Sequence, residues 1–270
     1  EQISGDWSTA SDVWLIGSPV TVRESPFGYF GGGYATGGSG GTYSSIRRID
    51  YSNDTAKFQQ RSSLDVVVQQ LAGVASLSYG YWAGGYWPGN LTSPSANTTN
   101  VRRLDFSNDT TAATPKGPLA SITANAAGTG TKDYGYFGGG VEPGTPITTV
   151  QRIDYANDTA TAVAKGPLTQ GRALLGATGN SKHGYWMAGW GTPSPSPARR
   201  STVDRLDYSS DTTAATPKGS LTAVKYGVGS TGNENFGYCA GGHPGPYSTV
   251  ERVDYTNDTA TALAKGTLAA

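Results

Sequence analysis

A string that carries carboxylate, amide and hydroxyl groups in a fixed order recurs five times along the 270-residue chain. It reads RIDYSNDT from Arg48, RLDFSNDT from Arg103, RIDYANDT from Arg152, RLDYSSDT from Arg205 and RVDYTNDT from Arg252. Oxygen ligands of this kind suit calcium, and two carboxylates in one pocket suit glycoside hydrolysis. However, the run lacks the glycine and the distal glutamate of an EF-hand loop. Turn formation by Asp50, Asn53 and Asp54 is therefore the better account.

The spacing of the string points to a repeat architecture. Its first aspartates are separated by 55, 49, 53 and 47 residues and are Asp50, Asp105, Asp154, Asp207 and Asp254. This period matches a four-stranded propeller blade rather than a solenoid turn. A chemical site is rarely needed in five copies, so we expect the repeated residues to be scaffold.

Each unit offers four short strand candidates bounded by turn residues. A glycine-rich string precedes the first one, as GYFGGG at Gly28 or GYWMAG at Gly184. In the unit near Arg172 we predict an inner strand ALLGATGN, a second strand HGYWMAGW, a third strand STVDRLDY and an outer strand TTAATPKG. Aromatic residues alternate in the second strand, so their rings should point to opposite faces and pack on both neighbouring blades. The repeats are centred on residues 28–64, 80–119, 135–168, 184–221 and 237–268.

The third strand has one charged face and one apolar face by the two-residue period of a strand. Arg48 and Asp50 share the charged face, and an unpaired buried charge there would be strongly destabilising. We therefore predict a ring of inter-blade ion pairs, called latches below. The residues predicted to form them are Arg48, Asp50, Arg103, Asp105, Arg152, Asp154, Arg205, Asp207, Arg252 and Asp254.

The glycine-rich second strand, the third strand that closes with aspartate, and the Gly-Pro-Leu connector together resemble the kelch repeat. The resemblance covers roughly residues 20–270 and implies an all-β fold, a β-propeller of four-stranded antiparallel blades. The tryptophan expected in the fourth strand is replaced by alanine and threonine, as in TATAVAKG from Thr159. In wording the repeat is most similar to kelch-like repeats in virion structural proteins of phages that infect marine bacteria.

Residues 7–19 align with an outer strand plus connector, with Gly17 matching Gly166. We therefore predict an N-terminal extra strand or cap at 1–19 and a propeller at 20–270. Five blades with this appendage are the first expectation. The alternatives are six blades completed by other segments, and an open array.

The loops between second and third strands vary where everything else repeats, and in a propeller they share a face with the connectors between blades. Candidate ligand- or partner-binding residues in these loops are Tyr34, Tyr86, Trp87, Trp190, His243 and Tyr247. Such aromatic side chains suit stacking on sugar rings or a protein partner's hot spot. The competing interpretation is that they shield strand ends and pack between loops.

Composition excludes several classes of function. With 20 basic and 20 acidic residues the net charge is zero, so nothing draws the chain to nucleic acid. No apolar run approaches the length of a membrane span, so we expect no membrane insertion. Cys239 is the single cysteine, which excludes an internal disulfide. His183 and His243 occupy non-equivalent positions. We predict no catalytic residues, no metal site and no cofactor.

These observations favour a non-enzymatic structural or host-surface-binding propeller module of a virion, of the phage tail or fibre type, or of an extracellular assembly. Its partners would be other protein subunits and a cell-surface glycan. The alternative is a free lectin-like propeller that binds carbohydrate, although the five loops are not equivalent. An enzyme is the third hypothesis, with a loop carboxylate such as Glu142 as the residue to test.

Overall fold

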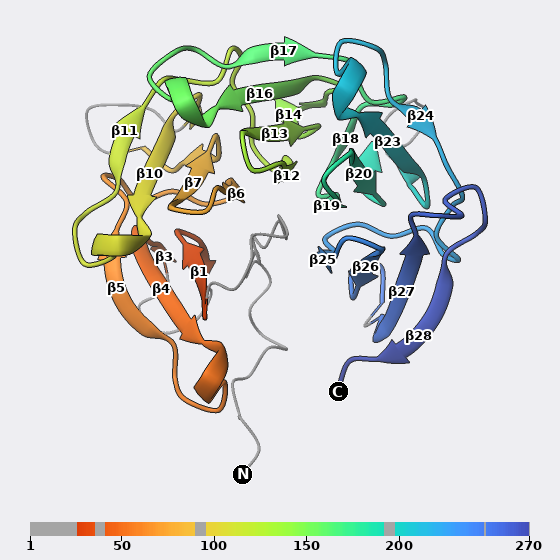
Figure 1. The fold of residues 1–270 in the computed structure, drawn as a ribbon, viewed down its shortest axis with the longest axis horizontal. Helices are drawn as coiled ribbons and strands as arrows, with labels where there is room; N and C mark the ends of the chain where they lie inside the picture. The colour runs from red at the N-terminus through yellow and green to blue at the C-terminus, as the bar shows by residue number, and fades with distance from the viewer. Residues whose placement is uncertain (1–25, 36–40, 90–95, 192–197, 246, 270) are drawn as a thin grey trace.

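The protein is an all-β propeller in which each repeat unit forms one antiparallel sheet (Figure 1). The computed structural model describes residues 26–35, 41–89, 96–191, 198–245 and 247–269. The predicted extra strand at 1–19 lies outside the described residues. Within the described residues, no helix is long and apolar enough to cross a membrane.

Five sheets follow one another around a common axis, with the N-terminal strand of each unit innermost (Figure 1). The first sheet contains β1 (Phe27–Gly31), β4 (Ser45–Asp50) and β5 (Gln59–Ser63). The second contains β6 (Ala72–Ala75), β7 (Tyr79–Ala83), β10 (Val101–Asp105) and β11 (Thr114–Lys116). The third contains β12 (Ala127–Gly130), β13 (Tyr134–Gly138), β16 (Val150–Asp154) and β17 (Val163–Lys165).

The fourth sheet contains β19 (Gly176–Gly179), β20 (His183–Met187), β23 (Val203–Asp207) and β24 (Thr216–Pro217). The fifth contains β25 (Gly229–Gly232), β26 (Phe236–Ala240), β27 (Thr249–Asp254) and β28 (Leu263–Thr267). The four strands predicted for the unit near Arg172 are thus confirmed in order and position.

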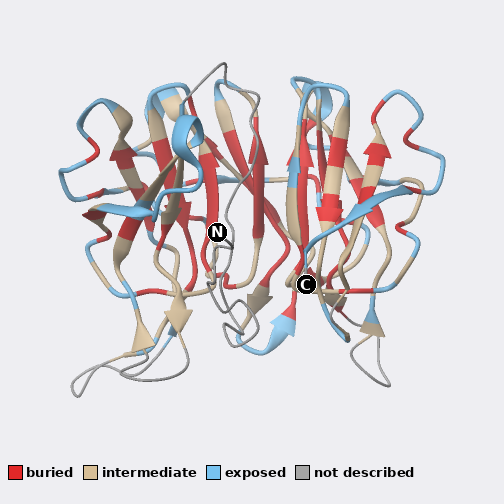
Figure 2. Ribbon diagram, turned by 90° about the horizontal axis from the view of Figure 1, so that it is seen from below, coloured by how far each residue is buried: buried red, intermediate tan, exposed pale blue. Residues whose placement is uncertain are grey.

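Short hairpins extend the link between second and third strands. They are formed by β2 (Tyr34–Ala35) with β3 (Gly41–Thr42), β8 (Tyr86–Trp87) with β9 (Ala96–Asn97), and β14 (Val141–Glu142) with β15 (Thr145–Pro146). In the fourth unit, β21 (Trp190–Gly191) pairs with β22 (Ala198–Arg199) and also with β18 (Arg172–Ala173), which belongs to the connector between blades. These hairpins project from one edge of the sheets (Figure 2), and we call this side the loop face.

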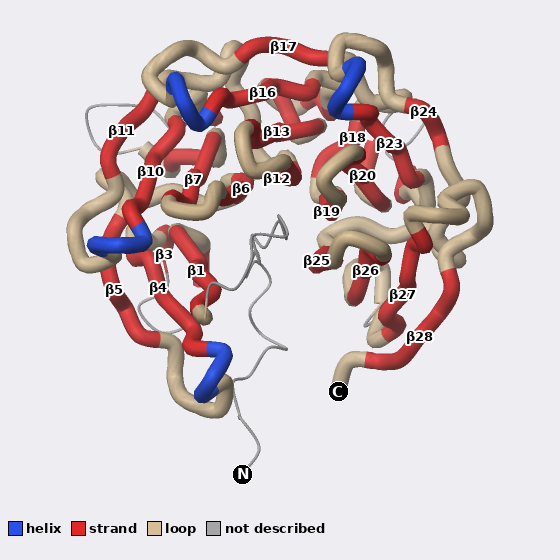
Figure 3. The backbone as a smooth tube through the Cα atoms, in the orientation of Figure 1, coloured by secondary structure: helices blue, strands red, loops and turns tan. Residues whose placement is uncertain are grey.

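The repeated NDT segment forms a longer link than the tight hairpin turn that the sequence predicts. Four of the five links open with one turn of 3-10 helix (blue in Figure 3): η1 (Tyr51–Asn53), η2 (Phe106–Asn108), η3 (Tyr155–Asn157) and η4 (Tyr208–Ser210). The first aspartate of the string is the N-cap of each helix, in extended backbone conformation. Its carboxylate accepts a hydrogen bond from a backbone N–H that the short helix leaves unpaired.

The core lies in layers between neighbouring sheets, where buried strand residues face each other (Figure 2). In the second strands the rings point alternately to the two sides, as predicted. The Tyr81 ring stacks on Tyr155 of the next sheet at 4.9 Å between centroids, while Trp82 lies against Gly31 of the preceding sheet. A side chain at Gly31 would collide with this indole, because a Cβ there would come within 2.8 Å of it. Glycine is therefore a packing residue in this strand.

Gly166, after the outer strand of the third sheet, gives a direct test of the packing between sheets. Its N–H donates to Asp211 O of the next sheet at 2.7 Å, and a Cβ would overlap the carbonyl oxygen of Thr213. We expect Gly166→Ala to lower the free energy of unfolding by about 1–3 kcal/mol, measured by urea denaturation.

The matched control is Gly266→Ala, at the equivalent position of the fifth sheet, where nothing lies within 4 Å of the added carbon. This substitution should change stability by less than about 0.5 kcal/mol. Equal effects of the two substitutions would contradict the packing described here.

Candidate functional site

The repeated string places one carboxylate in each gap between sheets, where it accepts from three donors of the preceding sheet. In the gap between the third and fourth sheets, Asp211 Oδ2 accepts from the Tyr136 hydroxyl at 2.8 Å and from Arg152 Nη1 at 2.7 Å. Lys165 Nζ lies 3.0 Å from the other carboxylate oxygen. Asp211 is nearly buried, so these bonds are shielded from water. We call this group of four side chains a latch.

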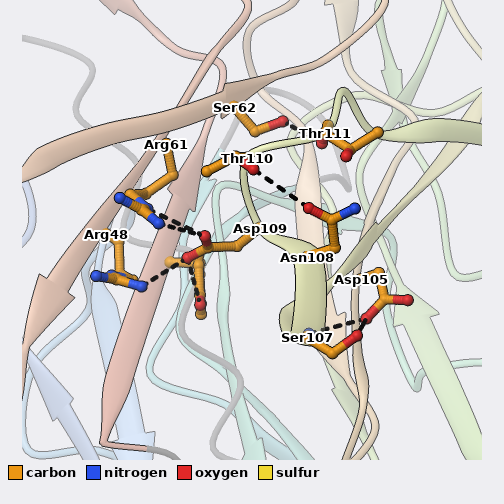
Figure 4. A network of polar contacts seen from close by, with 10 residues as sticks. Arg48, Arg61, Ser62, Asp105, Ser107, Asn108, Asp109, Thr110 and Thr111 are labelled. Carbon is orange, nitrogen blue, oxygen red and sulfur yellow. Dashed lines mark hydrogen bonds and ion pairs between the residues drawn. The ribbon is translucent and has the colours of Figure 1, made fainter.

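The same latch closes three other gaps. Asp109 is held by Tyr29, Arg48 and Arg61. Asp158 is held by Tyr81, Arg103 and Lys116. Asp258 is held by Tyr185, Arg205 and Lys218. Figure 4 shows Arg48 and Arg61 converging on Asp109 from the neighbouring sheet. A tyrosine, an arginine and a second cation thus share one acceptor in each of these gaps.

The carboxylate of the latch is not the one that the sequence predicted. Asp50, Asp105, Asp154, Asp207 and Asp254 instead accept from the backbone N–H two residues further on, at 2.8–2.9 Å. They lie at the end of a strand, where the chain turns into the 3-10 link and presents that N–H. The second aspartate of the string, four residues later, reaches the preceding sheet.

The predicted arginines lie where strand parity places them, on the face toward the next sheet. Arg48, Arg103, Arg152 and Arg205 form the inter-sheet ion pairs given above. Arg252, in the fifth sheet, lies with Cζ 4.1 Å from the centroid of the Phe236 ring.

The electrostatics of the latch favour the ionised carboxylate. Burial alone would raise the pKa of Asp109, but hydrogen bonds from Arg61 and Tyr29 and the charges of Arg48 and Arg61 outweigh it and lower that pKa. The balance has the same sign at Asp211 and Asp258, where the pKa is also lowered. Burial, followed by the hydrogen bond to Asp109, raises the pKa of Tyr29 to about 12. The tyrosine therefore stays a donor at neutral pH.

A second set of buried polar contacts was missed by sequence reasoning. The residue just before the motif arginine is buried in four units and bonds the connector that enters its own sheet. Arg102 pairs with Asp65, Gln151 accepts from Ser121 N at 2.9 Å, Asp204 pairs with Arg172 at 2.7 Å, and Glu251 pairs with Lys225. The signal in the sequence is that this position is polar in all five units, although the third strand is apolar on that face.

The structure places the candidate aromatic residues on the loop face, in the short hairpins and next to the connectors. Tyr86 exchanges backbone hydrogen bonds with Gln69, Trp190 pairs with Ala173, and His243 exchanges hydrogen bonds with Tyr226. Tyr34 and Trp87 lie in β2 and β8, and Tyr247 follows His243 in the fifth unit. Most of these side chains are half-buried and His243 is exposed. They share a face, as predicted.

Ring contacts in this set lie within the fifth unit. His243 stacks on Tyr226 with centroids 5.5 Å apart, and Lys225 Nζ lies 6.0 Å from the Tyr247 ring. The loops thus pack on their own connectors, which supports the structural interpretation for part of each side chain. The exposed parts of these aromatic residues belong to separate loops.

Backbone hydrogen bonds join the connectors to one another below the loops. Asn125 N donates to Gln70 O at 2.8 Å, Leu174 N to Asn125 O at 3.0 Å, and Gly227 N to Leu174 O at 2.7 Å. Gln70, Asn125, Leu174 and Gly227 all have positive φ, which lets each connector turn its N–H toward the previous one. This chain of bonds fixes the bases of the loops relative to one another.

The remaining titratable candidates lie apart. His183 begins β20, with Nε2 4.0 Å from Asp207 Oδ2, whereas His243 follows the far end of β26. Burial raises the pKa of the Cys239 thiol to about 12. This thiol lies in an apolar cluster with Tyr185, Met187 and Val253, so it behaves as a small core residue.

Comparison with known proteins supports the fold. No family model and no curated protein matches the chain. Among solved structures, the chain is similar to one described as "Structure of YjhT", with a TM-score of 0.73 and 12% sequence identity. The match covers 90% of this chain and 82% of that chain. At this identity the likeness shows a shared propeller architecture.

The two aspartates of one string provide a matched test of the latch. We expect Asp211→Asn to lower the free energy of unfolding by about 2–3 kcal/mol, because it leaves Arg152 and Lys165 without a charged acceptor. Asp154→Asn should cost less than about 1 kcal/mol, because asparagine also caps the 3-10 turn. Urea denaturation measures both free energies of unfolding. A larger loss for Asp154→Asn than for Asp211→Asn would show that Asp211 is not the carboxylate that holds the two sheets together.

The latches also predict a loss of stability in acid. Because the pKa values of Asp109, Asp211 and Asp258 are lower in the folded protein, their contribution is complete above the unfolded value of about 3.9 and is lost as pH falls through the folded values. The urea midpoint should be nearly flat from about pH 7 to 5 and fall below about pH 4. Asp109→Asn should show a shallower fall, whereas a curve parallel to the wild type would refute this assignment.

Proposed function

We propose that the protein is a non-enzymatic propeller module of a virion or of an extracellular assembly, which acts as a structural or host-surface-binding subunit. The observation that carries the proposal is the contrast between the two kinds of segment. The latches repeat from gap to gap with the same geometry, while the loops on one face differ in every unit. A constant frame with one variable face is the arrangement expected of a module that presents contacts to a partner.

The engagement of the charged groups supports a structural role. Most of the charged residues of the repeat form latches, cap the 3-10 turns or contact the connectors, as described above. Perturbed ionisable groups mark active sites when they line a cleft. Here the carboxylates with lowered pKa values pair between sheets or cap turns, and burial lowers the pKa values of Arg172, which pairs with Asp204, and of His183 at the start of β20. The groups that stand out electrostatically therefore have a structural explanation.

The proposed setting rests on the repeat itself. Its sequence is similar to kelch-like repeats of phage virion proteins. The low content of charged residues, 15% of the chain, suits a subunit that packs against other proteins. The partners that we propose are other protein subunits of the assembly and, for a host-surface role, a cell-surface glycan.

A lectin-like function is the second candidate, supported by the half-buried aromatic residues of the loop face. Trp87 and Trp190 lie in equivalent hairpins of the second and fourth units, and both are half-buried there. Aromatic rings are suited to stacking on the apolar faces of sugars.

A glycan array probed with the full chain tests the lectin candidate. If the loop face binds sugar, Trp87→Ala and Trp190→Ala should each weaken binding about tenfold or more, the size of a hot-spot truncation. Val163→Ala, at an exposed position of the outer strand β17, is the control and should bind normally. Absence of binding, or equal binding by all variants, removes the lectin candidate.

The native mass of the particle that contains this chain tests the assembly role. We expect a particle much larger than 27.9 kDa, and a monomer as the only native form would contradict the proposal. Hydrolysis of a polysaccharide that is lost in Glu142→Gln would contradict the non-enzymatic role.

A further inference from the structure

The fifth sheet carries the three donors of a latch but no acceptor for them among the described residues. Tyr238, Arg252 and Lys265 are the equivalents of Tyr136, Arg152 and Lys165. Within the described chain, Arg252 and Lys265 form no ion pair, whereas Arg152 and Lys165 both pair with Asp211. We call this side of the fifth sheet the donor end. It has the donor half of the latch that joins each of the other pairs of neighbouring sheets.

The apolar part of the donor end is exposed as well. Leu268 is 48% exposed, whereas its four equivalents, Leu64, Leu119, Leu168 and Leu221, are 2–3% exposed. Thr231 in the inner strand is exposed, but its equivalents Thr129 and Thr178 are fully buried and bond Tyr208 and Tyr255 of the next sheet. The missing contacts therefore run from the inner strand to the connector that follows the outer strand.

The first sheet presents the opposite half of the same interface, which we call the acceptor end. Asp54 is the equivalent of the latch carboxylate Asp211, and it is exposed. Tyr51 is 60% exposed, whereas its equivalents Tyr155, Tyr208 and Tyr255 stack on the tyrosine of the preceding sheet at 4.6–4.9 Å. Among the described residues, the ring and the carboxylate of the acceptor end thus lack the contacts that hold their equivalents in the other gaps.

The two ends do not cover each other. In Figure 1 the described strands form an arc that begins at β1 and ends at β28, and the first and fifth sheets are not side by side. The open side of the arc lies between the donor end and the acceptor end, neither of which has its latch partners within the part of the chain that the structure describes.

We propose that this open side receives a sixth blade built from the same repeat. A blade of this sequence carries Asp and Tyr of its NDT link on one face and the Tyr, Arg and Lys donors on the other. One such blade would supply a carboxylate to Arg252, a ring to Tyr238 and donors to Asp54. It satisfies both ends at once with contacts that the protein already forms in four gaps.

A second copy of the chain is the competing occupant. Its acceptor end could dock on the donor end, but this head-to-tail contact leaves one donor end and one acceptor end free unless several copies close into a ring. A single blade leaves no unpaired end. This inference concerns the sides of the arc and is independent of the function proposed for the loop face.

The test adds one repeat to the full chain by placing a second copy of residues 222–268 after Leu268. The added unit should raise the melting temperature by about 5 °C or more, because it covers both ends. Substituting the added copy's Asp258→Asn should remove most of that rise. An added unit that leaves the melting temperature unchanged, or whose gain is untouched by the substitution, would overturn the proposal.

A matched pair of substitutions in the natural chain provides a second reading. Arg152→Ala should lower the melting temperature by several degrees, whereas Arg252→Ala should leave it unchanged in the natural chain and lower it only when the sixth unit is present. Equal losses from the two substitutions in the natural chain would show that Arg252 already has its partner.

Sedimentation of the natural chain distinguishes the second occupant. For the isolated chain, separated from the other subunits of its native particle, a monomer across the accessible concentration range agrees with the sixth blade. A polymer that Arg252→Ala dissolves would overturn it and assign the open side to a second copy.

Discussion

The structure depends on one carboxylate in each gap between sheets. Neighbouring sheets are held by apolar layers, which fix no register by themselves, and by an aspartate that accepts from a tyrosine, an arginine and a second cation of the preceding sheet. Because the acceptor is nearly buried, any shift that separated it from its donors would leave charges unpaired in the gap. The latch therefore sets how each sheet sits on the next, and with it the position of every loop that a sheet carries.

Much of the fold follows from periodicity in the sequence. A repeat of about fifty residues with a two-residue alternation in each strand identifies the blade, its four strands and the two faces that the aromatic residues serve. The choice between the two aspartates of the string does not follow in the same way. Strand parity places Asp50 beside Arg48, but the 3-10 link that begins there offers a backbone N–H to Asp50 and carries Asp54 and its equivalents to the neighbouring sheet. Which carboxylate crosses a gap depends on the path of that link in three dimensions.

The candidate site lies where the sequence stops repeating, in the loops between second and third strands. Loops that differ in every unit all lie on one face, with their bases tied by hydrogen bonds between connectors. The sequence could not say that these loops continue the sheets as short hairpins, or that Tyr86 and Trp190 pair with the connectors. Those pairings lie next to Gln70 and Leu174, whose positive φ carries no sequence signal as clear as a glycine. The latches repeat in each gap while the loops differ from unit to unit, so the chain is a constant frame that varies on the loop face alone.

A double-mutant cycle between Tyr136→Phe and Asp211→Asn tests the central claim most directly. The two residues are 75 positions apart in the sequence and lie in different sheets, so any coupling between them must cross the gap. If the latch holds the two sheets together, urea denaturation of the four chains should give a coupling free energy of at least about 1 kcal/mol. Additive effects within about 0.3 kcal/mol would mean that the latch does not hold the sheets together, and would contradict the account.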